Sequence, residues 1–111
     1  MKGTMIKNAS MLARFLDSLR DPFVFIDTDH VVRYLNKVAL ERHGEELLGT
    51  SIFDCHNEKS NKMIREIFSK MADGLEEELI TDNEKHRIYM RAVRDEKGKL
   101  IGYYERYEPP N

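Results

Sequence analysis

Cys55 and His56 are the neighbouring residues whose side chains offer the sharpest local chemistry in the sequence. An imidazole at this place can ligate haem iron, and a cysteine can serve as a thiolate ligand or a redox sensor. The structural alternative is that His56 makes a hydrogen bond that holds its loop while Cys55 fills a small apolar gap. We favour this alternative, because adjacent residues in an ordered segment usually point in different directions.

The other histidines give no sign of a metal centre. His30, His43 and His86 are scattered along the chain without the spacing of metal ligands, so we expect no metal site. The sequence also contains no Gly-rich phosphate loop, and no histidine-kinase or nucleotide-cyclase segment. We therefore predict that the chain is not an enzyme.

The bulk composition limits the partners of the chain. Its 111 residues are enough for one domain with a real core, and 18 basic against 20 acidic residues give a net charge of -2. No clustered basic face favours nucleic acid, and no apolar run is long enough to span a bilayer. A single cysteine excludes an internal disulfide and fits a reducing compartment. We expect a cytoplasmic location without membrane contact.

The beginning of the chain is predicted to be an amphipathic helix over residues 7–19. Met5, Ala9, Leu12, Leu16 and Leu19 recur at spacings of four, three, four and three, which places them on one face. This face can lie on the sheet of its own domain, or it can also pair with a second subunit. We therefore divide the chain into a cap or dimer helix at 1–20 and a core at 21–108.

The core is predicted to contain a β-hairpin, then a layer of several helices separated by glycine turns, and then a meander of three strands. Apolar runs at 23–26 and 31–35, joined by a polar turn, predict the hairpin. Asn36 suits the N-cap of a helix over 37–43, and Gly44 and Gly49 can each take the positive φ that ends a helix. The remaining elements are a helix over 58–72 and strands at 75–81, 86–94 and 99–107.

Three segments of this core resemble the PAS domain family. They are Phe-Ile-Asp-Thr-Asp-His-Val-Val-Arg-Tyr-Leu-Asn at 25–36, His-Gly-Glu-Glu-Leu-Leu-Gly-Thr-Ser-Ile-Phe-Asp at 43–54, and Val-Arg-Asp-Glu-Lys-Gly-Lys-Leu-Ile-Gly at 93–102. His30 stands where the family more often has Gly, and it tolerates unusual turn geometry. Residues 55–60 resemble a subgroup with Cys-His and then Lys-Ser before the long helix, although Asn57 replaces its usual Pro.

The resemblance implies an α+β fold in which a five-stranded antiparallel sheet carries a helical layer on one face, with the amphipathic helix before it. It also implies a sensory or regulatory module that binds a small apolar ligand, dimerises, or relays a signal to an effector or kinase domain. One alternative is a haem-binding redox or gas sensor using His56, although haem-binding members usually take their histidine from the long helix, which here has none. Another is a pure interaction domain with a filled core. We expect no flavin, because the Asn-Cys-Arg run of the light-sensing branch is missing.

Strand faces that follow the family give two candidate surfaces. The predicted ligand pocket is lined by Val24, Ile26, Ile64, Phe68, Ile88, Met90 and Tyr104. Two-residue periodicity sends the other aromatic residues, including Tyr107, to the opposite face, which carries too many to remain in water. With the first helix, this face is the predicted homodimer surface, formed by Leu12, Leu16, Phe23, Phe25, Tyr89, Ile101 and Tyr103.

Overall fold

The computed structural model describes Met5 and residues 8–110, apart from the side chain of Cys55. Five strands form one antiparallel sheet in the order β2-β1-β5-β4-β3, which confirms the predicted fold class. The strands are β1 (Val24–Asp27), β2 (Val32–Leu35), β3 (Glu77–Asp82), β4 (Arg87–Arg94) and β5 (Leu100–Glu108). The helices are α1 (Ala9–Asp17), α2 (Lys37–His43) and α3 (Glu58–Ala72), with 3-10 turns at Glu45–Leu47 and Ile52–Cys55.

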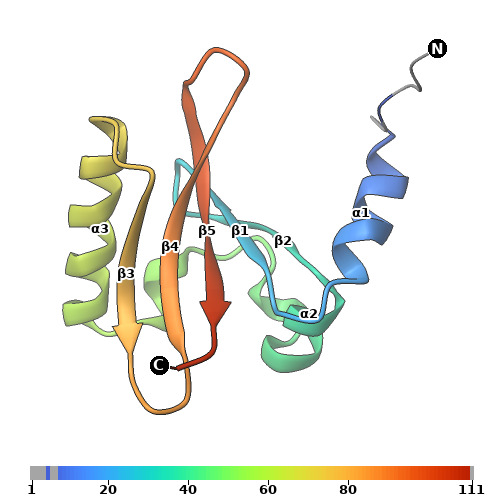
Figure 1. Cartoon of the computed structure of the whole chain (residues 1–111), viewed down its shortest axis with the longest axis horizontal. Helices are drawn as coiled ribbons and strands as arrows, with labels where there is room; N and C mark the ends of the chain where they lie inside the picture. Colours follow the sequence, from blue (N-terminus) through green and yellow to red (C-terminus); the bar gives the residue numbers. More distant parts are fainter. Residues whose placement is uncertain (1–4, 6–7, 111) are drawn as a thin grey trace.

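The sheet has an inner face, covered by α2, α3 and the turns between them, and an outer face opposite (Figure 1). The core lies against the inner face. Ile26 and Met90 from the sheet are almost fully buried there, as are Ile64, Ile67 and Met71 on successive turns of α3. A helix with such a stripe is stabilised by packing on the sheet, because a short helix is marginal alone in water.

Local signals set the helix bounds as predicted. Asn36 caps α2 by accepting a hydrogen bond from the backbone of Ala39, and Asn57 caps α3 in the same way from Ser60. Gly44 ends α2 with φ 85° and Gly49 has φ 82°, so the chain turns twice between α2 and α3.

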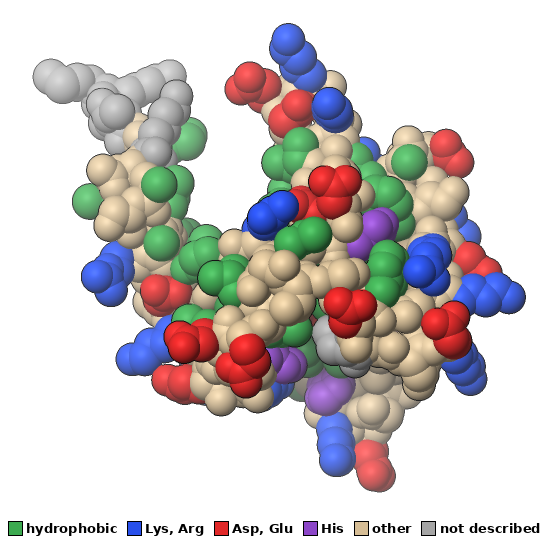
Figure 2. Space-filling view, turned by 180° about the vertical axis from the view of Figure 1, so that it is seen from behind, with side chains coloured by type: hydrophobic (Ala, Val, Ile, Leu, Met, Phe, Trp, Pro, Cys, Tyr) green, Lys and Arg blue, Asp and Glu red, His purple; other side chains and the backbone are tan. Residues whose placement is uncertain are grey.

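The first helix does not lie on the sheet, so the prediction that its own sheet covers it is wrong. None of the residues of α1 is buried, and the helix stands apart from the sheet with hydrophobic side chains on its surface (Figure 2). Only its last turns are attached. Tyr34 donates to Asp17 over 2.8 Å and lies 3.0 Å from the carbonyl oxygen of Ala13. Residue 7 of the predicted helix lies outside the described residues.

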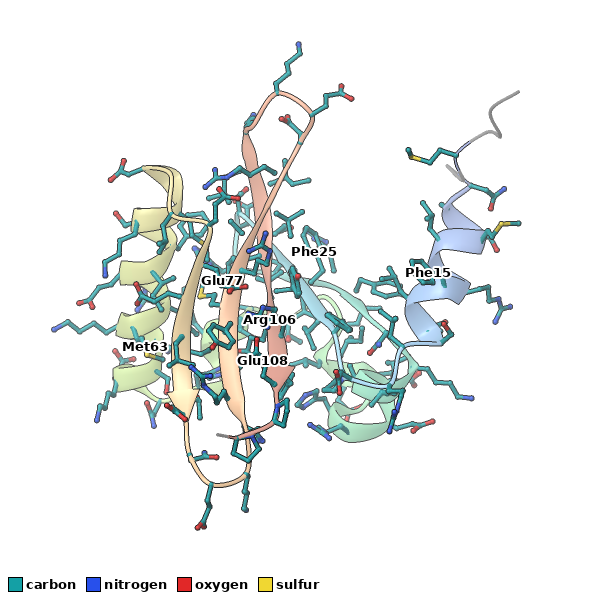
Figure 3. The ribbon with its side chains drawn as sticks, in the orientation of Figure 1. Phe15, Phe25, Met63, Glu77, Arg106 and Glu108 are labelled. Atoms are coloured by element: carbon teal, nitrogen blue, oxygen red, sulfur yellow. The ribbon has the colours of Figure 1, made fainter. Side chains whose placement is uncertain are left out.

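The outer face divides into a charged part and an apolar part. Over β3, β4 and β5, the Arg106 guanidinium grips the Glu77 carboxylate with two hydrogen bonds of 2.6 and 2.8 Å. Arg106 also bonds to Glu108, which lies beside it on the sheet (Figure 3). Its guanidinium lies over the ring of Tyr89, 4.1 Å from the ring centroid. Glu77 is thus held in a bidentate pair on the surface of the sheet.

In the described part of the chain, no helix has the length and apolar character needed to cross a bilayer.

Candidate ligand-binding site

A cavity of about 310 Å³ lies on the inner face of the sheet, where β1 and β5 face the end of α2 and the two 3-10 turns. Its apolar walls come from Val24 and Ile26 on β1 and from Leu47 and Ile52 in the turns. Alternation along β1 turns both of its residues inward, as predicted. This volume lies at the lower end of the range for small-molecule pockets.

Three polar side chains complete the lining of this cavity: His43 at the end of α2, His56 before α3, and Glu105 on β5. A second cavity of about 190 Å³ lies beneath α3, and its lining includes the predicted pocket residues Ile64 and Ile88. His56 and Glu105 line both cavities, so these two side chains stand between them.

Burial shifts the pKa values of two polar groups of the site in opposite directions. Burial raises the pKa of Glu105, and the nearby His56 offsets this only in part. The pKa of His43 is lowered by burial and by the neighbouring Arg42 and His56. Among the described residues, neither cavity has an arginine or lysine in its lining.

His56 has a defined structural role. Its Nδ1 atom lies 2.9 Å from the carbonyl oxygen of Ile52, a hydrogen bond that closes the turn before α3. This is the loop-holding contact that the structural alternative predicted. The other half of that alternative concerned the side chain of Cys55, which lies outside the described part of the structure.

A cluster of rings on the inner face is formed by His30, Phe53, Phe68 and Tyr103. His30, at φ 64° in the turn between β1 and β2, bonds through Nδ1 to the Tyr103 hydroxyl at 2.9 Å. The rings of Phe53 and Phe68 each lie 4.6 Å from the His30 ring. Burial and the charge of Arg65 lower the pKa of His30. The turn that lacks the expected glycine is thus held by contacts of its histidine side chain.

The strand faces of β5 differ from the prediction. Tyr103 points inward and is 2% exposed, whereas Tyr104 packs on Phe23 at 5.6 Å on the outer side. The prediction had exchanged these two tyrosines. Tyr107, predicted outside, lies against His86 and near Arg42 of α2. Because side chains alternate along a strand, the corrected register also turns Glu105 inward.

The other predicted pocket residues do not line the cavities. Met90 is a core residue at 1% exposure, and Phe68 belongs to the ring cluster. The prediction missed His43, Leu47, Ile52 and Glu105. An inward register for Tyr103 would have identified Glu105, since the two residues are two apart on one strand.

An apolar groove of about 470 Å³ lies on the outer side, between the end of α1 and the sheet. It brings together Leu16, Phe23 and Phe25 of the predicted dimer surface with residues that the prediction did not assign to it. These additions are Tyr34, Val93 and Tyr104. Phe15 on α1 and Phe25 on β1 lie on opposite sides of the space between helix and sheet (Figure 3).

The rest of the predicted dimer surface lies elsewhere. Leu12 is exposed on α1, beside the groove-lining Leu16. Tyr89 lies beneath the guanidinium of Arg106 in the charged part of the outer face. Ile101 is exposed at an irregularity in the pairing of β4 with β5, and Tyr103 is buried on the inner face.

Comparison with known proteins agrees with this architecture. The family model described as "PAS fold" matches residues 16–109. The C-terminal domain of a protein from Streptococcus mutans is 19% identical, with a TM-score of 0.77 over 98% of this chain and 90% of that one. A PAS domain from Colwellia psychrerythraea is 13% identical, with a TM-score of 0.66 over 90% and 94% of the two chains. A structure described as a sensory box sensor histidine kinase from Vibrio cholerae is 16% identical, with a TM-score of 0.63 over 90% and 89%. No curated protein matches the chain.

Proposed function

The chain belongs to the PAS fold family, and we propose that it is a sensory or regulatory module that binds a small ligand on the inner face of its sheet. The observation that carries this proposal is the 310 Å³ cavity, whose aliphatic walls surround three polar side chains. A concave pocket with apolar walls and a few polar groups is typical of small-molecule sites, so this one supports ligand binding over the alternative of a filled core.

A pair of tryptophan substitutions tests the pocket. Leu47 lines the cavity, so the larger ring of Leu47→Trp should occupy the space. Its neighbour Leu48 is 52% exposed and lines neither cavity, which makes Leu48→Trp the matched control. In a fragment screen followed by protein NMR, Leu47→Trp should abolish binding that Leu48→Trp retains. A screen in which both variants bind the same fragments as the wild type would contradict the proposal.

The second part of the proposal is that the module associates with another copy of itself through the outer groove and α1. The groove is apolar, and it is continuous with a helix face on which Met11 is 55% and Phe15 is 61% exposed. Exposed apolar patches of this kind usually mark interaction sites. A second α1 suits the groove, because an amphipathic helix laid in an apolar groove buries both surfaces at once.

The expected energy is sufficient for association. Burial of about 400 Å² of apolar surface contributes roughly 10 kcal/mol at ~25 cal/mol per Å², before the entropy cost of association. Sedimentation equilibrium should give twice the monomer mass for the wild type. Phe15→Glu, which places a charge in the interface, should weaken the dimer by about 30-fold or more, or roughly 2 kcal/mol.

Ser10→Glu is the matched control for this test. Ser10 is exposed and lies on the polar side of α1, so its substitution should leave the dimer intact. A monomeric wild type would refute the self-association. Equal masses for the two variants would refute the role of the apolar face of α1.

The output of the module is proposed to lie in an effector or kinase domain, attached or in a partner protein. The Vibrio cholerae neighbour, which is described as a sensor histidine kinase, supports this class of output. The module itself would relay a signal and catalyse nothing. The haem alternative gains no support from a cavity of about 310 Å³, because a macrocycle would require the walls to move.

A further inference from the structure

Glu105 is a half-buried acidic side chain that lines both inner cavities. Its carboxyl group accepts no hydrogen bond from any residue that the structure describes, and the charge that favours its ionised form is that of the nearby His56. A carboxylate removed from water without a partner costs free energy, so buried carboxylates are normally paired. Here an acceptor is kept on the wall of a cavity, and the fold itself does not use it.

Apart from His56, the rest of the cavity offers no group that would attract an anion. In the described part of the chain its lining contains no arginine or lysine, and burial lowers the pKa of His43, which disfavours its cationic form. The four aliphatic side chains of the lining suit a ligand with an apolar body. The described residues also provide no group of three or more His, Cys, Asp or Glu side chains that could hold a metal ion. The lining therefore suits an organic cation better than an anion or a metal.

Resting on the proposed ligand pocket, we infer that this cavity takes a small organic cation, a primary ammonium group on a compact apolar body. The ammonium group donates to the Glu105 carboxylate, and the body lies against Val24, Ile26, Leu47 and Ile52. A hydrogen bond between two charged groups is roughly twice as strong as one between neutral groups. The ammonium supplies hydrogen bonds that no described residue donates to this carboxylate, so the bound state offsets part of the cost of its burial.

Three probes with one ring and different charge test this inference on the full chain: benzylamine, benzyl alcohol and benzoate. Binding is measured by titration with each probe while the ¹⁵N-¹H NMR signals of the cavity-lining residues are followed. The wild type should bind benzylamine at least about tenfold more tightly than either other probe, a difference of about 1.4 kcal/mol. The signals that shift should include those of β5 and the turn at Ile52–Cys55.

The same substitution, glutamate to glutamine, at two positions tests whether Glu105 causes the preference for benzylamine. Glu105→Gln keeps the shape of the side chain and removes its charge, so it should weaken benzylamine by about tenfold or more and leave benzyl alcohol within about twofold. Glu96→Gln, in the exposed loop between β4 and β5, should change neither value. The benzyl alcohol value also shows that the variant pocket is folded.

The outcomes separate this inference from the proposed function. Tighter binding of benzoate or benzyl alcohol would overturn the preference for a cation and leave the pocket standing. Equal binding of benzylamine by Glu105→Gln and the wild type would overturn the role assigned to Glu105. Failure of all three probes to shift any cavity signal would count against the pocket itself as well as the cation.

Discussion

Replacement of Asn36 by alanine should remove a buried junction that fastens α1 to the domain. The side-chain oxygen accepts from the backbone N–H groups of Phe23 and Ala39, at 2.9 and 3.1 Å. The side-chain nitrogen donates to the carbonyl oxygens of Leu16 and Asp21, each at 3.0 Å. Asn36 is 0% exposed, so water cannot replace these partners. At about 1 kcal/mol for each hydrogen bond, the loss is roughly 4 kcal/mol.

Urea unfolding followed by circular dichroism measures this loss. A domain with a stability of about 5–15 kcal/mol should show a large fall in its midpoint. Asn57→Ala is the matched control, because this exposed cap makes a single hydrogen bond and should cost about 1 kcal/mol. Asn36→Asp keeps both accepted bonds but loses the two donated ones. At about 1 kcal/mol for each lost bond, it should lower the free energy of unfolding by about 2 kcal/mol or more. Equal costs for Asn36→Ala and Asn57→Ala would refute the junction.

Three further predictions concern β5. Glu105→Gln should become more stable relative to the wild type as pH rises above 4.5, the ordinary pKa of glutamate. Burial raises the pKa of Glu105, so only the wild type loses stability as pH rises through that pKa, and the other groups of the lining are the same in both proteins. Thermal melts from pH 4 to 8 should show the difference growing with pH, and a constant difference would contradict it. Tyr103→Phe should lower the free energy of unfolding, measured in urea, by about 1 kcal/mol, whereas Tyr104→Phe should change it little. The reverse order would support the register first predicted for β5. Gly102→Ala should cost more than about 2 kcal/mol, because its Cβ would lie 2.6 Å from the Phe25 ring; an unchanged urea midpoint would show that the two strands can separate.

The elements that the sequence predicted best are those with local signals at their ends. Asn36 and Asn57 cap α2 and α3, and the bounds of these helices agree with the prediction. Side chains also alternate on β1 and β4 as predicted, since Val24 and Ile26 line the cavity while Met90 and Ala92 belong to the core or pack against it.

The wrong predictions concern the direction of side chains and the surface that covers a helix, which residue type alone does not determine. Tyr103 and Tyr104 are identical neighbours, so residue type cannot decide which of them faces inward, and a slip by one residue reverses every side chain on β5. This slip concealed Glu105, the polar residue on which the proposed ligand chemistry depends. The amphipathic pattern of α1 likewise showed that one face is apolar, but the pattern does not specify the surface that covers it.

Native mass spectrometry of the gently purified chain shows whether the inner cavity holds a small molecule. The spectrum should contain a species heavier than the chain by the mass of one small, amine-containing molecule per copy, and Leu47→Trp should lose this extra mass. The bare mass for both proteins, with added amines failing to bind the wild type, would contradict the account.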